Sequence, residues 1–261
     1  MSHIAQTNIQ LYEQLRLSGY DDAAVVAAAR AYALAQPLFS ARFRGSGRPF
    51  LCHLVGTASV LARDGASIEE VTAGLLHAAY DAGLFGYDMH RTVSPRKRAA
   101  VREAVGEAGE ALVAAYTALP WTGSTLERLA ASAARSPEER SVLRLRLANE
   151  LDDLADGGLR YTGREKASLV DDASHRAKLV TLAQQVDMPH LAADLEAALA
   201  SHGDRASQPA VAPGIRGPAY SYTRLPDAAR LRLSYRLAFF RRRLARRIGR
   251  AMPGKAGTDK Q

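Results

Sequence analysis

The sequence predicts an all-α fold, built as a helical bundle over residues 8–200. Alanine and leucine are abundant and β-branched and aromatic residues are sparse, a composition that favours helices over strands. Apolar residues recur at helical spacing, as in Leu143, Leu147 and Leu151. The sequence shows no convincing alternation typical of strands and no internal repeat.

Three helices are expected in the N-terminal part, over residues 8–18, 21–38 and 50–63. The second begins with Asp21 and Asp22, whose carboxylates suit the positive end of the helix dipole. A segment rich in arginine and glycine, residues 42–49, is expected to form a loop before the third helix.

Capping and breaking residues mark the helices that follow. Ser67, with Glu70 three residues later, forms a capping box, and its helix is expected to run to about Tyr80. After a glycine-containing loop over residues 81–94, Pro95 suits the first turn of a helix. The remaining helices are expected over residues 95–105, 107–116, from 136 through 151, 175–185 and 189–200, with a break at 119–124.

The positive charge is concentrated at the C-terminal end. The chain carries a net charge of +8, and residues 228–261 hold nine Arg and two Lys against one Asp, or +10, which leaves about −2 for residues 1–227. A nearly neutral body predicts no nucleic-acid groove. Residues 201–227, rich in Gly, Pro, Ser and Ala, are expected to form a flexible linker. Residues 251–261 are expected to be a disordered tail.

Residues 228–250 predict a cationic amphipathic helix. Leucine, phenylalanine and isoleucine recur there every three or four residues, with arginine between them. Such a helix binds an anionic membrane surface, although docking on the body or on a second subunit is the alternative. The single cysteine, Cys52, fits a reducing compartment, and no signal peptide or membrane-spanning run is found. We therefore expect a cytoplasmic protein that associates peripherally with the inner membrane.

Two histidines stand at the ends of apolar runs. His53 lies near the start of one expected helix and His77 near the end of the next. Each imidazole is either a metal ligand or a core histidine whose hydrogen bonds are satisfied within the protein. The sequence leaves both interpretations open.

Basic and acidic segments lie on either side of the histidines in the sequence. Arg44 and Arg48, in the glycine-containing loop before His53, are candidates for binding a phosphorylated small molecule, although a solvated loop is the alternative. Asn149 and Asp152 share one helix face, which is either solvated or turned toward the histidines. Tyr80 is a candidate to line the same site, or a plain core residue.

Three segments carry a resemblance to a known family. Arg44-Gly-Ser-Gly-Arg-Pro-Phe-Leu-Cys-His53, Leu75-Leu-His77-Ala-Ala-Tyr-Asp81 and Leu147-Ala-Asn149-Glu-Leu-Asp152 resemble the hydrolase domain of the bifunctional guanosine tetraphosphate (RelA/SpoT-type) synthetase/hydrolases. That domain belongs to the HD superfamily, and the resemblance covers about residues 25–160. It implies an HD-like helical bundle, one divalent metal, and a basic loop that contacts a nucleotide.

The resemblance assigns roles by position. His53 and His77 match metal ligands, whereas Ala78 and Asn149 stand where the family has metal-binding aspartates. Asp81 takes the place of the first member of the catalytic acidic pair. Asp152, the other candidate catalytic residue, could replace a missing ligand, as Asp81 or Asp153 could, only if the geometry differs from that of the family.

The chain is still more similar to an uncharacterised bacterial HD-like branch whose members often accompany genes for cell-surface polysaccharide assembly. The shared motifs are Pro49-Phe-Leu-x-His53, Ala73-Gly-Leu-Leu-His77 and Leu147-Ala-Asn149-Glu. The resemblance implies a ligand- or partner-binding protein with a degenerate metal site. The alternative is a phosphohydrolase that uses Mn, Fe or Zn and acts on a nucleotide or another phosphorylated substrate.

Overall fold

The all-α prediction is confirmed in the computed structural model, which describes residues 4–86, 93–132, 134–155, 157, 170, 172–206 and 221–223. The described residues contain two short strands, β1 (Arg42–Arg44) and β2 (Ser221–Thr223), which pair with each other. The helices are α1 (Asn8–Leu17), α2 (Asp22–Phe39), α3 (Phe50–Arg63), α4 (Ile68–Leu76), α5 (Ala79–Ala82), α6 (Pro95–Ala118), α7 (Gly123–Ala130), α8 (Pro137–Ala155), α10 (Ala173–Gln184) and α11 (Pro189–Ala206).

Side-chain caps fix where several helices begin. Ser67 accepts a hydrogen bond from the backbone N–H of Glu70, whose carboxylate accepts one from the Ser67 N–H, which confirms the predicted capping box. Asp21 caps α2 and Ser94 caps α6, with Pro95 in the first turn as expected. The helix starts could therefore be predicted to within a few residues.

The differences from the predicted elements lie at glycines and at chain reversals. The helix expected to reach Tyr80 ends at Leu76, and the chain turns at His77 and Ala78 before the short α5. Gly106, at φ +77°, separates the two parts of α6, close to the predicted boundary. The helix α7 and the strand β1 were not predicted, and α11 runs to Ala206, into the segment expected to be a linker.

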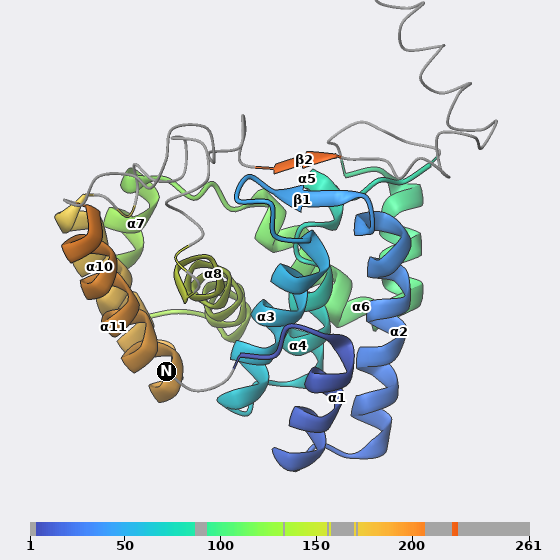
Figure 1. Ribbon diagram of the computed structural model, residues 1–261. Helices are drawn as coiled ribbons and strands as arrows, with labels where there is room; N and C mark the ends of the chain where they lie inside the picture. The colour runs from blue at the N-terminus through green and yellow to red at the C-terminus, as the bar shows by residue number, and fades with distance from the viewer. Residues whose placement is uncertain are drawn as a thin grey trace, which may run out of the picture. The chain divides into compact units, whose positions relative to one another are not determined.

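Helix α3 lies at the centre of the bundle (Figure 1). It packs against α4 on one side and against α8 on another, and α2 and α6 cover α4. The backbones of α3 and α4 come close together because Gly74 has no side chain: a Cβ there would lie 3.1 Å from the Cα of Ala58. This central packing holds the first turn of α3 against α8.

The pair α10 and α11 covers the far side of α8 (Figure 1). Its attachment to α3 is polar: the Asp64 carboxylate accepts hydrogen bonds from the N–H groups of His190 and Leu191 at 2.9 and 2.8 Å. Arg63 adds an ion pair with Asp194 at 2.7 Å. Asp64, which follows the last residue of α3, thus satisfies N–H groups at the start of α11 that have no partner within that helix.

Replacing Asp64 with alanine is expected to lower the free energy of unfolding by about 1 kcal/mol, the usual cost of losing a helix cap. Chemical denaturation measures the loss, and hydrogen exchange should be faster at the amides of His190 and Leu191. The matched control is Asp22→Ala, because Asp22 is exposed and should change stability by less than about 0.5 kcal/mol. Equal losses in both variants would contradict the capping role.

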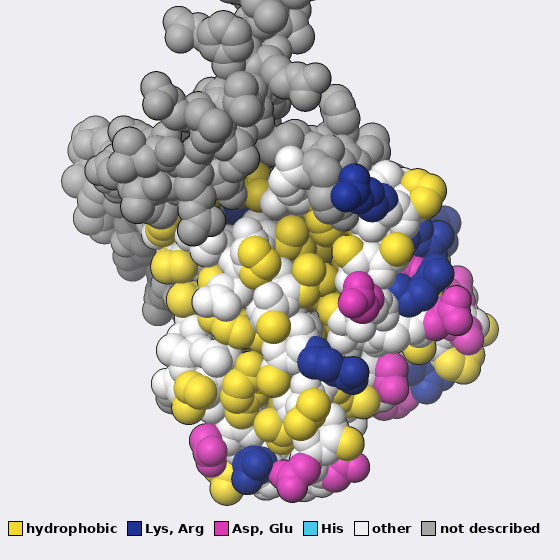
Figure 2. All heavy atoms as spheres, turned by 90° about the vertical axis from the view of Figure 1, so that its right-hand side faces the viewer, with side chains coloured by type: hydrophobic (Ala, Val, Ile, Leu, Met, Phe, Trp, Pro, Cys, Tyr) yellow, Lys and Arg dark blue, Asp and Glu magenta, His cyan; other side chains and the backbone are white. Residues whose placement is uncertain are grey.

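Figure 2 shows the side of the molecule on which α2 lies. Apolar side chains spread over the middle of this face with a few charged ones among them, and more charged side chains lie along its edges. Helix α2 buries Ala28, Ala31 and Ala35, while Val26 on its outer side is 57% exposed. The alanine-rich helix therefore presents small apolar groups outward as well as inward.

The chain divides into two compact units, residues 1–222 and 223–261. The predicted basic helix, residues 228–250, the tail, residues 251–261, and most of the predicted linker lie outside the described residues. Among the described helices, none combines the length and the apolar character that crossing a membrane requires.

Candidate functional site

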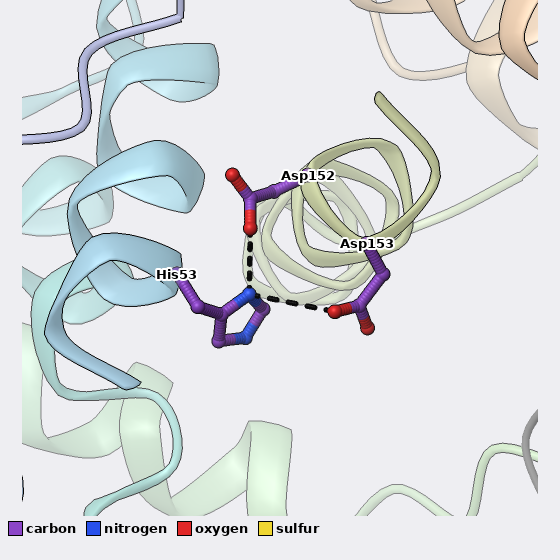
Figure 3. A group of neighbouring side chains, drawn as sticks. All are labelled: His53, Asp152 and Asp153. Carbon is purple, nitrogen blue, oxygen red and sulfur yellow. Dashed lines mark hydrogen bonds and ion pairs between the residues drawn. The ribbon is translucent and has the colours of Figure 1, made fainter. Parts of the chain in front are cut away.

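His53 projects from the first turn of α3 toward two adjacent carboxylates on α8. Its Nδ1 lies 2.7 Å from Oδ2 of Asp152 and 3.6 Å from Oδ1 of Asp153 (Figure 3). All three side chains are buried, with His53 0% and Asp152 1% exposed. The structure therefore brings the predicted residues His53 and Asp152 into direct contact across 99 residues of sequence.

His77 completes a chain of hydrogen bonds through the two imidazoles. Its Nδ1 lies 2.8 Å from the carbonyl oxygen of Gly74 and must donate, so its Nε2 is an acceptor. That Nε2 lies 3.3 Å from Nε2 of His53, which then supplies the hydrogen. Burial, together with the neighbouring His53, lowers the pKa of His77 well below its usual range.

The contact between His53 and Asp152 holds a second hydrogen. Both groups lie in the core, and burial raises the pKa of Asp152 to about 6 even though Arg48 opposes the shift. At 2.7 Å, either His53 donates from Nδ1 or Asp152 donates as a carboxylic acid. In both cases the histidines are satisfied within the protein, as one of the two interpretations of the sequence anticipated.

A tight turn places the two arginines beside the carboxylates. The N–H of Arg44 donates to the carbonyl of Arg48 at 2.8 Å, and Gly47 provides the left-handed residue at φ +90° that the turn requires. The predicted loop is thus a strand followed by this turn. Its short span brings both guanidinium groups to the same end of α8.

Each aspartate is paired with its own arginine. Arg48 donates from Nη1 to Oδ2 of Asp152 at 2.8 Å and from Nη2 to Oδ1 at 3.0 Å, a bidentate arrangement. Arg44, 4% exposed, donates from Nη2 to Oδ1 of Asp153. Two guanidinium charges therefore compensate the two carboxylate charges inside the protein. The interpretation of this loop as solvated is wrong for Arg44.

The ligand atoms of His53, Asp152 and Asp153 lie within 4.8 Å of one another, so this cluster could hold a metal ion. The donor set nevertheless differs from the one that the family resemblance implies. A hard divalent cation binds where carboxylate charge is uncompensated, and here each carboxylate forms an ion pair with arginine. The residues present do not fit the metal site of the family.

Two of the predicted site residues lie elsewhere. The Tyr80 hydroxyl donates to Oε1 of Glu110 at 2.7 Å, and Arg98 binds both oxygens of the same carboxylate. Burial and the hydrogen bond to Glu110 raise the pKa of Tyr80. Asp81, on α5, is exposed, in contrast to the buried cluster. The expected roles of Tyr80 in ligand binding and Asp81 in catalysis gain no support from these positions.

The acidic face of α8 is buried, so the interpretation of that face as solvated is wrong. Asn149 is 3% exposed and its Nδ2 donates to Oε1 of Glu150 at 3.1 Å. Asp153, one residue after Asp152, points to the same imidazole, that of His53. Ala78 is buried, and its methyl side chain offers no ligand atom. The carboxylates of the site therefore come from one turn later on α8 than the family pattern places its distal ligand.

Two neighbours of His77 also belong to the site. The Tyr116 ring packs edge-on against His77, with centroids 5.0 Å apart, and the Arg146 guanidinium lies 3.7 Å from the Tyr116 ring centroid. Arg146 also donates to the carbonyl of Leu119 at 2.7 Å. Tyr116 could be suspected from the sequence as a lining aromatic, whereas no sequence signal singled out Arg146.

Comparison with known families gives one result. Residues 38–120 match a family described as a domain of unknown function (DUF6817). The matched segment contains Arg44, Arg48, His53 and His77 but ends before the aspartates of α8. A search of the curated proteins finds no match.

Proposed function

We propose that this chain is an HD-like, non-hydrolysing protein that binds a phosphorylated ligand or a partner. We further propose that the protein serves cell-envelope polysaccharide assembly at the cytoplasmic face of the inner membrane. The role in polysaccharide assembly is supported by the motifs around His53, His77 and Asn149, which resemble those of the bacterial HD-like branch. The basic segment, residues 228–250, supports contact with an anionic membrane surface.

The observation that carries the proposal is the pairing of both carboxylates with arginine. A metal-dependent hydrolase needs anionic ligands with charge left for the cation. Asp152 and Asp153 are instead neutralised by Arg48 and Arg44. Ala78 adds no ligand atom, and Asp81 is exposed.

The same ion pairs favour a phosphate-containing ligand. Arg48 is the more accessible partner, with 14% of its side chain exposed against 1% for Asp152. A phosphate group would accept hydrogen bonds from the planar guanidinium as the carboxylate does. Binding would then exchange Asp152 for the ligand as the acceptor of Arg48.

A metal-dependent phosphohydrolase, using Mn, Fe or Zn, is the second candidate. It is favoured by the three ligand atoms within 4.8 Å and by the two facing imidazole nitrogens. Its catalytic step would require Asp152 to leave Arg48 and bind or activate at the metal. We rank it second because that rearrangement would break the two hydrogen bonds, of 2.8 and 3.0 Å, between Arg48 and Asp152.

Metal analysis of the purified full chain separates the two candidates. The chain should hold well under one equivalent of Mn, Fe or Zn after incubation with each metal and dialysis, and the content should be the same in His53→Ala. It should release no phosphate from nucleotides or nucleotide sugars. One equivalent of metal that disappears in His53→Ala, together with turnover, would overturn the binding-protein proposal.

A further inference from the structure

We infer that the Arg48 guanidinium is the resident cation of the His53 cluster, and that removing it creates a metal site at His53, Asp152 and Asp153. The inference rests on the proposed function, since it takes the wild-type cluster to be metal-free in use.

The position of Arg48 is the first argument. Its two terminal nitrogens bind both oxygens of Asp152, and the same Oδ2 lies 2.7 Å from Nδ1 of His53. The guanidinium therefore binds the carboxylate from which a metal ion would need an oxygen. Arg48 also donates to the backbone carbonyl of Cys52 and to the side-chain Oε1 of Gln6, and these hydrogen bonds hold its guanidinium group in place.

The balance of charge is the second argument. With both arginines present and both carboxylates ionised, the charges of the two arginines and two aspartates sum to zero, before any charge on His53. A divalent ion would add its charge beside two guanidinium groups in a buried site. Without Arg48 the net charge of these positions is −1. A divalent cation at Asp152 would then lie near one guanidinium group, that of Arg44 on Asp153, instead of two.

The hydrogen bonds of His77 supply the third argument. Its Nε2 accepts a hydrogen from Nε2 of His53, so a neutral His53 carries its lone pair on Nδ1, toward the aspartates. A ligating histidine that is oriented through its other nitrogen is a common feature of metal sites. One imidazole nitrogen and two carboxylates form a donor set that suits Zn²⁺, Fe²⁺ or Mn²⁺.

The test is a Zn²⁺ titration of the full chain by calorimetry, with thermal unfolding measured in Zn²⁺ and in chelator. Arg48→Met should bind about one Zn²⁺ more tightly than the wild type by on the order of 10–100-fold. In chelator it should unfold at a lower temperature than the wild type, and Zn²⁺ should raise that temperature. Co²⁺ bound to Arg48→Met should show visible absorption bands that the wild-type chain lacks.

Two controls isolate the effect of Arg48. Arg63→Met removes an arginine from the Arg63–Asp194 pair, whose side chains are 15% and 19% exposed, and should gain no Zn²⁺ affinity. Arg48→Met combined with Asp152→Asn removes the carboxylate ligand and should abolish the gain. If Arg48→Met does not fold, Arg48→Gln keeps a hydrogen-bond donor without the charge and serves in its place.

The outcomes distinguish this inference from the proposed function. A folded Arg48→Met or Arg48→Gln variant with the Zn²⁺ affinity of the wild type overturns the inference and leaves the proposed function standing. A wild-type chain that already binds one Zn²⁺ through His53 overturns both. A gain confined to the Arg48 variants supports the inference.

Discussion

Replacing Asp152 with alanine is expected to lower the free energy of unfolding by about 3–5 kcal/mol. The side chain is 1% exposed, accepts hydrogen bonds from Arg48 and shares a hydrogen with Nδ1 of His53. Its removal leaves a guanidinium and an imidazole in the core without their anionic partner. Urea unfolding followed by circular dichroism measures the loss.

The control for this prediction is Asp194→Ala. Asp194 also pairs with an arginine at 2.7 Å, but both side chains of that pair are partly exposed, so the loss should stay near 1 kcal/mol. A second comparison is Asp152→Ala with Arg48→Met, in which the unpaired guanidinium is absent and part of the stability should return. Similar small losses for Asp152→Ala and Asp194→Ala would show that the buried cluster contributes little.

Replacing Gly56 with alanine is expected to lower stability by about 2–3 kcal/mol, although alanine is the better helix former. Gly56 lies on α3 and faces the Asp152 carboxylate. A Cβ there would lie 1.8 Å from Oδ1 of Asp152 and 3.2 Å from Nη2 of Arg48. The carboxylate cannot move away without losing its hydrogen bonds to Arg48 and His53.

Gly86→Ala is the matched control, because a Cβ at Gly86 meets no atom within 4 Å. It should change stability by less than about 0.5 kcal/mol. Nitrogen chemical shifts of the His53 imidazole provide a second readout, since they should change in Gly56→Ala and stay the same in Gly86→Ala. If Gly56→Ala proves neutral, the close packing of α3 on Asp152 is not what the structure describes.

Most of the helices could be predicted because their signals are local. Ser67 and Pro95 mark starts through contacts within one turn, and a chain rich in alanine and leucine favours the helix between such marks. The strand β1 could not be predicted, because its partner β2 lies far away in the sequence. Nor could the end of α4 at Leu76, since alanines continue after His77 without a breaking residue.

The site could be predicted in part. Apolar flanks indicated that His53 and His77 are buried, and helical spacing put Asp152 and Asn149 on one face of a helix. Which acidic face would be buried depends on how α8 packs on α3, and spacing within α8 carries no information about that. The pairing of Arg48 with Asp152 joins residues 104 apart, so no local pattern could have indicated it.

The distance in sequence between the arginines and the aspartates also affects the order in which they appear during synthesis. During synthesis the turn with Arg44 and Arg48 and both histidines emerge long before the aspartates of α8 do. A growing chain that has reached residue 120 therefore contains Arg44 and Arg48 but not yet Asp152 and Asp153, with which they pair. Because Arg48 and Asp152 are 104 residues apart, their ion pair can form during synthesis only once α8 has been made.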